Sequence, residues 1–453
     1  MAFSFSSHSY RSGAYSLLNR LVIVFFGFQN IFFMVRMIPK GDIGVWSLFI
    51  SVTTILELLR NGFIRNPMIT HLVSAESEEE RGRVITASWV LHIILVLFTS
   101  LVLFVIAVPL TQFWDAPQLD VLFYIYILRG LALIPSLQFE YLQQSLVNFR
   151  AIFWGNVAKL APTGIYIFVK YVQVGIFETG VAPTLYDIAV AQLLSAVFSI
   201  FVGYFFLRNT RVIYPKVDWR SVGMLSGFGK FTLGTTISSM VIKNTDSWMI
   251  GRMISPEGVA SYNPALRISN LIEVPTLAVA SVVFPQVNRK MQQGGKAGLE
   301  DVYVKSVSVI LAMMLPVVIP LYVFSDFIIK LIFTSAYLEA SPILRVTLFF
   351  TLLIPFNRQF GTLMDALKRP KINFYLLVMM GVLNVVMNFL FIRAYGTIGA
   401  AYGTLLAYVV IFILNQVILF RMFDISTLKV IPAIWDWYRT GFTMVKKRIF
   451  KSA

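Results

Sequence analysis

Basic residues inside apolar segments are the feature of this chain that could do chemistry. Of 38 Lys and Arg residues, eight interrupt otherwise apolar stretches: Arg20, Arg129, Lys159, Lys243, Arg267, Lys330, Arg345 and Arg358. A charge in the middle of a bilayer costs at least ~2.5–3.5 kcal/mol on insertion scales, so such residues usually face a cavity and serve a function. A surplus of cavity cations needs an anion, and a phosphate or diphosphate is the simplest candidate.

Acidic residues near these cations offer some of them an internal partner. Glu57 precedes Arg60 by three residues, and Glu273 follows Arg267 by six. Asp246 follows Lys243 by one helical turn, so these two form either a structural pair or part of an ion-coupling site. Arg129 and Arg345 have no acid within a turn, which leaves a partner on another helix open. The candidate substrate-binding residues are therefore Arg60, Arg267, Arg20, Arg129 and Arg345, with helix-end snorkelling as the alternative for Arg60 and Arg267.

Catalytic and metal-binding patterns are missing from the sequence. Gly227-Phe228-Gly229-Lys230 lacks the upstream glycine of a phosphate-binding loop and is followed by Phe231. The three histidines, His8, His71 and His92, are not at metal-site spacing, and there is no cysteine. His92 lies by itself on an apolar segment, where a packed, hydrogen-bonded role is favoured over a proton relay. Neither an enzyme nor a metal or cofactor site is predicted.

The elements that must position these cations are membrane-spanning helices. Hydrophobic residues make up 57% of the 453 positions and charged residues 13%, about half the charged share of a soluble domain. Apolar runs of about 20 residues, each long enough to cross a bilayer, recur throughout. They predict spans near 15–37, 43–64, 84–109, 119–139, 152–172, 185–207, 230–252, 259–284, 304–333, 342–366, 374–393 and 397–420.

The distribution of Lys and Arg predicts the orientation. With twelve spans, 25 of these residues lie on the side of both termini and five on the other. Because cytoplasmic loops keep the excess of Lys and Arg, both termini are expected in the cytoplasm. The net charge of +16 is thus a topology signal and not a nucleic-acid-binding stripe. The tail, with Trp435, Trp437 and Lys446, is expected to be a basic amphipathic helix that anchors to the membrane surface rather than docking a partner.

An internal repeat divides the chain. Arg36-Met37-Ile38 recurs as Arg252-Met253-Ile254, and Ile127-Leu128-Arg129 recurs as Ile343-Leu344-Arg345, both at an offset of 216 residues. The sequence therefore predicts an all-α polytopic membrane protein with two pseudo-symmetric six-helix lobes and a substrate cavity between them. The expected boundaries are an N-terminal tail 1–14, a first lobe 15–207, a connector 208–229, a second lobe 230–420 and a tail 421–453.

Several segments resemble those of polysaccharide-export flippases. Asn244 to Ile268, followed by Val283-Phe284-Pro285-Gln286-Val287, resembles the signature of their seventh and eighth spans. Gly44 to Leu48 with Leu59-Arg60-Asn61-Gly62-Phe63 resembles the second span, and Asn384–Asn388 with Tyr395–Thr404 resembles the turn between the last two. These motifs cover nearly the whole chain and are similar to those of the multidrug/oligosaccharidyl-lipid/polysaccharide superfamily.

The resemblance implies a V-shaped bundle that moves undecaprenyl-diphosphate-linked oligosaccharide across a bacterial inner membrane for O-antigen, capsule or exopolysaccharide synthesis. Glycan polymerase or glycosyltransferase partners and a driving Na⁺ or H⁺ gradient would accompany this role. In the lipid II branch, arginines on the first, second and eighth spans bind the diphosphate. Arg60 and Arg267 match two of these, and Arg20 matches the first loosely.

Two departures from the superfamily patterns bear on the alternatives. Many prokaryotic multidrug members carry a coupling aspartate on the first span, whereas 15–37 contains no acid. This weakens the alternative of a cation-coupled multidrug exporter and leaves the coupling ion open. The lipid II flippases usually have two further C-terminal spans, for which this sequence shows no apolar runs.

Overall fold

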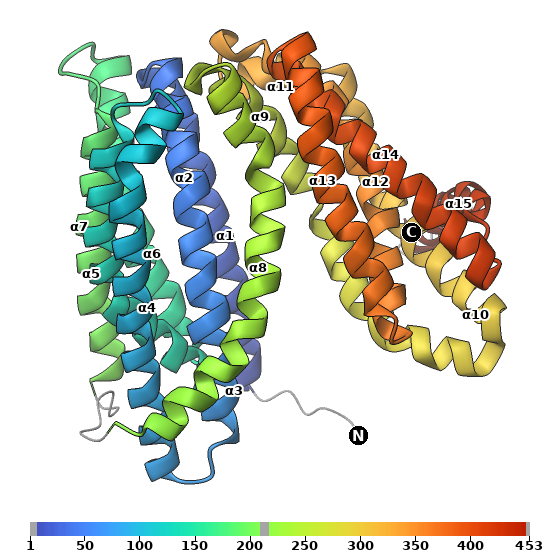
Figure 1. Cartoon of the computed structure of the whole chain (residues 1–453), viewed down its shortest axis with the longest axis horizontal. Helices are drawn as coiled ribbons and strands as arrows, with labels where there is room; N and C mark the ends of the chain where they lie inside the picture. The colour runs from blue at the N-terminus through green and yellow to red at the C-terminus, as the bar shows by residue number, and fades with distance from the viewer. Residues whose placement is uncertain (1–6, 209–216, 450–453) are drawn as a thin grey trace. The chain divides into compact units, whose positions relative to one another are not determined.

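A computed structural model shows an all-helical chain (Figure 1). It describes the backbone of residues 7–208 and 217–449, and their side chains apart from 7–11, 228–242, 441–442, 444–449 and part of 274–292. Within these ranges ten helices are long and apolar enough to span a membrane. The predicted seventh and eighth spans fall on α8, α9 and the first part of α10, several of whose side chains lie outside the described residues. The all-α membrane fold predicted from the apolar runs is confirmed.

The N-terminal half of the chain is built from the helices α1 to α7. They are α1 (Ser7–Met37), α2 (Lys40–Arg60), α3 (Asn66–Ser74), α4 (Glu78–Phe113), α5 (Leu119–Ser145), α6 (Phe149–Tyr171) and α7 (Leu185–Leu207). One π-helical turn, Asn61–Arg65, joins α2 to α3, and another, Val172–Ile176, ends α6. The predicted second span thus continues well past residue 64, and residues 7–14, expected as a tail, form the first turns of α1.

The second half of the chain begins with α8 and ends with α15. Its elements are α8 (Trp219–Met253), α9 (Pro256–Ile272), α10 (Val274–Val323), α11 (Ser325–Ile332), α12 (Ala340–Ala366), α13 (Pro370–Tyr395), α14 (Thr397–Phe423) and α15 (Val430–Ile449). Gly295, at φ 54° and ψ −136°, turns the chain inside α10, a conformation that glycine adopts without strain. Phe324 breaks the predicted span 304–333, so α11 is a separate helix of eight residues.

The chain forms two compact units. The N-terminal unit comprises residues 1–244 and 255–257, and the C-terminal unit comprises 245–254 and 258–453. Residues 219–229, expected in a connector, are the first turns of α8. Asp218 caps this helix by accepting hydrogen bonds from Ser221 and from the Arg220 backbone N–H. These donors, with Ser221 contributing most, hold the pKa of Asp218 below its usual range.

Small residues allow α13 and α14 of the C-terminal unit to pack closely. A Cβ atom added to Gly399 would lie 2.0 Å from the Phe391 carbonyl oxygen, and one on Gly403 would lie 2.7 Å from the Asn388 backbone nitrogen. Small residues at such interfaces replace the hydrophobic drive that is missing between helices in lipid. This close approach of α14 to α13 brings Thr404 beside Asn388, which matters for the site described below.

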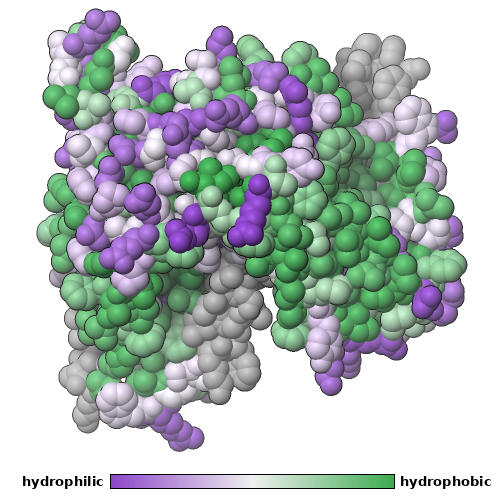
Figure 2. All heavy atoms as spheres, turned by 45° about the horizontal axis from the view of Figure 1, so that its top comes forward, coloured by the Kyte–Doolittle hydropathy of each residue, from purple (hydrophilic) through white to green (hydrophobic). Residues whose placement is uncertain are grey.

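The outer surface is that of a membrane protein. Figure 2 shows broad areas of apolar side chains on the visible flanks, with polar side chains gathered toward the helix ends. Large apolar side chains stand exposed along single helices, as do Phe201 and Phe205 on α7, at 68% and 58%. Exposed apolar surface on this scale is stable where lipid covers it.

The tail helix α15 docks on the second part of α10. The Trp437 indole donates to Ser308 Oγ at 3.0 Å, and the Tyr438 hydroxyl donates to the Ala312 carbonyl at 2.9 Å. Lys429, just before α15, pairs with Glu300 at 2.6 Å. Trp435 remains 60% exposed, consistent with an interfacial role for that face. The basic residues Lys446, Lys447 and Arg448, part of the expected anchor, lie outside the described side chains.

Candidate functional site

Arg60 is a guanidinium enclosed in the N-terminal unit. It ends α2 where the π turn Asn61–Arg65 begins, and such turns recur at functional sites. The side chain is 2% exposed, and its Nε and Nη1 atoms have no hydrogen-bond partner. Because a buried donor without an acceptor is costly, Arg60 is poised to take an anionic acceptor.

The acid nearest to Arg60 in sequence is engaged elsewhere. Glu57 accepts from Arg129 Nη1 of α5 at 2.9 Å, with the Arg129 side chain 18% exposed and that of Glu57 43% exposed. Arg129, expected to bind substrate, therefore has a carboxylate partner on another helix. The charge of Arg60 also acts on Glu57, but the ion pair itself belongs to Arg129.

Gly130 makes room for the Arg60 guanidinium. A Cβ atom at this position of α5 would lie 2.8 Å from Arg60 Nη2. We expect Gly130→Ala to displace the flexible end of Arg60 while changing the free energy of unfolding by less than about 1 kcal/mol, since alanine suits a helix interior. Binding of a diphosphate ligand should weaken about tenfold or more, because the loss of one charge-assisted hydrogen bond has that effect.

Titration of a short prenyl diphosphate into the purified variant measures this effect, with thermal unfolding as the companion measurement. Gly223→Ala, on α8, is the matched control, because a Cβ there meets nothing within 4 Å. Equal affinity in wild type and Gly130→Ala would show that Arg60 need not hold its present position.

Arg267 is the corresponding cation without a partner in the C-terminal unit. It lies near the end of α9 and is half-buried. Within the part of the chain that the structure describes, Arg267 forms no ion pair. Glu273, six residues on, instead pairs with Arg358 of α12. In each unit the acid nearest in sequence thus pairs with a second arginine, Arg129 or Arg358, and not with Arg60 or Arg267.

The two other expected cations lie in different settings. Arg345 donates to Ser325 Oγ at 2.7 Å and to Asp326 Oδ2 at 2.8 Å, in an ion pair whose two side chains are 39% and 65% exposed. Arg20 is exposed on α1 and forms no ion pair among the described residues. The geometry therefore distinguishes Arg60 and Arg267 from Arg129 and Arg345, which the sequence had grouped together.

Asp246 lies in a nest of neutral hydrogen-bond donors. Its carboxylate, 5% exposed on α8, accepts from the Tyr262 hydroxyl at 2.7 Å, Asn388 Nδ2 at 2.5 Å and Thr404 Oγ1 at 2.9 Å. Asn384 Nδ2 donates to Thr404 Oγ1 at 2.8 Å. Lys243, which the sequence pairs with Asp246, is exposed, and the hydrogen bonds to the Asp246 carboxylate come from these neutral groups.

Sequence reasoning missed the residues that build this nest. Asn384 and Asn388 are four residues apart on an apolar span, so they share one helix face. Two amides at that spacing in a membrane segment were an available signal of an intramembrane polar site. Tyr262 and Thr404 gave no such signal, because only packing brings them to Asp246. The described residues hold no cluster of three His, Cys, Asp or Glu side chains able to bind a metal ion.

Comparison with known proteins places these features in a family. The probable low-salt glycan biosynthesis flippase Agl15 of Haloferax volcanii is 26% identical over 195 residues, which cover 43% of this chain and 41% of that protein. The lipopolysaccharide biosynthesis protein WzxC of Escherichia coli is 22% identical over 90% of this chain and 79% of its own length. The chain thus spans less than half of the first relative and most of the second.

Solved structures show the same fold. An inward-facing multidrug resistance transporter of the MATE family, in the MOP superfamily, matches with a TM-score of 0.71 at 15% identity over 87% of this chain and 94% of that one. The lipid II flippase MurJ matches with a TM-score of 0.68 at 15% identity, over 96% and 92%. At 15% identity these likenesses show the fold of this chain. The sequence pattern of one family runs through residues 33–342, and this chain belongs to that family, the polysaccharide biosynthesis proteins.

Proposed function

We propose that this protein is a flippase that moves an undecaprenyl-diphosphate-linked oligosaccharide across the membrane by alternating access. The observation that carries the proposal is the pair of intramembrane guanidinium groups, Arg60 and Arg267, neither of which forms an ion pair among the described residues. A diphosphate supplies several anionic oxygens for planar, bidentate recognition by arginine. The glycan-flippase relatives support a lipid-linked glycan as the cargo.

The energy source in this proposal is an ion gradient acting on the Asp246 nest. A carboxylate buried among neutral donors is a place where binding of H⁺ or Na⁺ changes the local charge by one unit. The oxygen atoms of Asp246, Asn388 and Thr404 are of the type that hard cations prefer. Binding there would favour one conformation of the carrier over the other, as alternating access requires.

The same proposal includes an orientation with both termini in the cytoplasm and placement in a bacterial inner membrane. The excess of Lys and Arg on the side of the termini supports the orientation. Cytoplasmic glycosyltransferases would deliver the substrate, and a polymerase on the other side would consume it.

The deciding experiment is transport by the purified protein in proteoliposomes. Fluorescent undecaprenyl-diphosphate oligosaccharide is placed in both leaflets, and the fraction that an impermeant reductant can reach is followed after an ion gradient is imposed. We expect the labelled lipid to accumulate in one leaflet only when protein and gradient are both present. Gradient-driven efflux of cationic dyes without lipid movement would instead establish the multidrug exporter alternative.

A further inference from the structure

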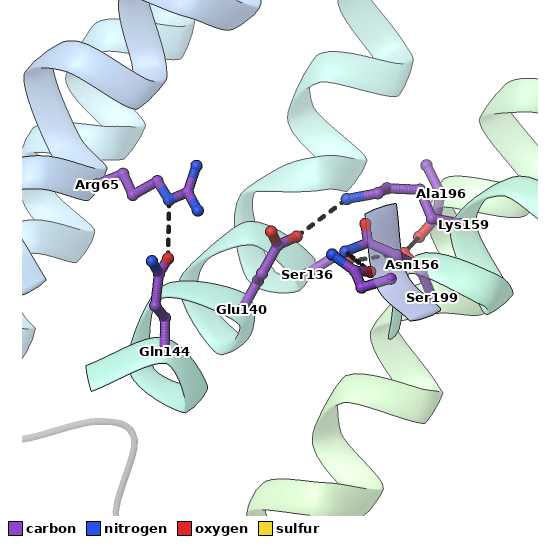
Figure 3. A network of polar contacts seen from close by, with 9 residues as sticks. Arg65, Ser136, Glu140, Gln144, Asn156, Lys159, Ala196 and Ser199 are labelled. Atoms are coloured by element: carbon purple, nitrogen blue, oxygen red, sulfur yellow. Dashed lines mark hydrogen bonds and ion pairs between the residues drawn. The ribbon is translucent and has the colours of Figure 1, made fainter. Parts of the chain in front are cut away.

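Lys159 and Glu140 form an intramembrane ion pair in the N-terminal unit. Lys159 of α6 donates to Glu140 Oε2 of α5 at 3.0 Å, with side chains 17% and 20% exposed. Figure 3 shows the two side chains pointing toward each other, with Ser136 and Ser199 beside them. A surface ion pair would be worth little, but a pair in a membrane holds two charges that would each be costly alone. Neither Lys159 nor Glu140 therefore leaves the other unless a different charged group takes its place.

Glu140 also borders a pocket with no other charged group in its lining. The pocket lies between α5, α6 and α7 and has a cavity volume of about 20 Å³. Its lining consists of Ser136, Phe139, Glu140, Gln143, Ala151, Ile152, Gly155, Ser199 and Gly203. Glu140 is thus the one titratable residue in this wall, and it borders a space that holds about one water molecule.

Gln143 supplies an acceptor in the same pocket. It lies one helical turn after Glu140 on α5, and its Nε2 donates to the Phe206 carbonyl at 3.2 Å. Its Oε1 is buried and has no donor. A carboxylate cannot donate to this oxygen, whereas a protonated carboxyl group can. The unused acceptor fits a neutral Glu140 that has left Lys159.

Lys159 lies among charged groups whose ion pairs an anion could exchange. Its ammonium acts on Glu57 as well as pairing with Glu140, and Glu57 is held in turn by Arg129. Lys159 from α6 pairs with Glu140, and Arg65 from the π turn donates to Gln144, four residues further along α5, at 2.9 Å. Glu140 and Glu57 thus pair with Lys159 and Arg129, two cations that could otherwise bind the phosphates of a substrate.

We propose that Glu140, Lys159 and Gln143 form a proton-linked switch, in which Glu140 holds Lys159 until the diphosphate of the substrate takes its place. The Lys159 ammonium keeps its proton and transfers its hydrogen bond from Glu140 to a phosphate oxygen. Glu140 takes one proton from water and turns toward Gln143. Its protonated carboxyl group then donates a hydrogen bond to Gln143 Oε1. Substrate binding and proton uptake are then linked, because a carboxylate without its cation is unstable in this environment. The inference rests on the proposed function, since it needs a diphosphate substrate.

The test is calorimetric titration of farnesyl diphosphate into the full-length protein in nanodiscs. Titrations in two buffers of different ionisation enthalpy count the protons taken up per ligand bound. We expect close to one proton for wild type and none for Glu140→Gln, which should also bind about tenfold tighter because the competing carboxylate is gone. Lys159→Gln should bind about tenfold more weakly. Gln143→Leu should bind while taking up distinctly less than one proton.

The control is Glu79→Gln, which removes the carboxylate of an exposed ion pair with Arg83 at 2.6 Å and should behave as wild type. Unchanged proton uptake in Glu140→Gln would overturn the switch while leaving the flippase proposal intact. Failure of wild type to bind any prenyl diphosphate would overturn both. If Glu140→Gln does not fold, Gln143→Leu decides, because proton uptake equal to wild type in that variant is incompatible with the switch.

Discussion

Arg267→Ala is expected to lower export of the lipid-linked glycan sharply while the protein still inserts and folds normally. Arg267 forms no ion pair among the described residues, so its removal leaves no carboxylate unpaired. The substrate would lose a charge-assisted, bidentate contact worth about 1.5–3 kcal/mol, or roughly 10–100-fold in affinity. Arg60→Ala should act in the same direction, and the double variant should fall to background.

The measurement is surface glycan in a strain whose own flippase has been deleted, set beside the amount of protein in the membrane. Arg345→Ala is a matched control, since this arginine is engaged by Asp326 and Ser325 and should retain most activity. Arg267→Lys should recover only part of the loss, because an ammonium cannot form the bidentate contact. Normal glycan in well-expressed Arg60→Ala and Arg267→Ala strains would show that the diphosphate binds elsewhere.

Asp246→Asn is expected to uncouple transport from the ion gradient. Asparagine keeps the size of the side chain but cannot change charge by binding H⁺, and it is a weaker ligand for Na⁺. In proteoliposomes, gradient-driven accumulation should fall about 100-fold, whereas exchange of labelled for unlabelled lipid without a gradient should persist. Imposing Na⁺ and H⁺ gradients separately on the wild type identifies the ion.

Asp326→Asn provides the comparison, because that carboxylate is 65% exposed and pairs with Arg345 in the same unit. It should leave gradient-driven transport near the wild-type level. Asp246→Ala should lower stability more than Asp246→Asn, since it strands the Tyr262, Asn388 and Thr404 donors at about 1–3 kcal/mol for each buried group left unpaired. Gradient-driven accumulation that survives in Asp246→Asn would remove this nest from the coupling mechanism.

The fold was largely readable from the sequence because the bilayer imposes a simple rule. Each backbone polar group must be satisfied within its own segment, so an apolar run of about 20 residues becomes a helix. The predicted runs accordingly match helices from α1 to α14. The errors fall where the sequence is polar but helical, as at residues 219–229, or apolar but interrupted, as at Phe324. Neither the π turn after Arg60 nor the left-handed turn at Gly295 followed from hydropathy.

By itself, the sequence determined that this chain is a membrane protein with unusual intramembrane cations. It also selected Arg60, Arg267 and Asp246 as residues of interest, because residue type and position in an apolar run are enough to recognise a costly charge. Only the tertiary structure decided which charges neutralise one another. Glu57 pairs with Arg129, Glu273 with Arg358, and Glu140 with Lys159, each across two helices. Sequence distance does not encode such contacts, since they depend on how the helices rotate and pack. Among the residues that the structure describes, that packing leaves Arg60 and Arg267 without a carboxylate partner and gives Asp246 three neutral donors.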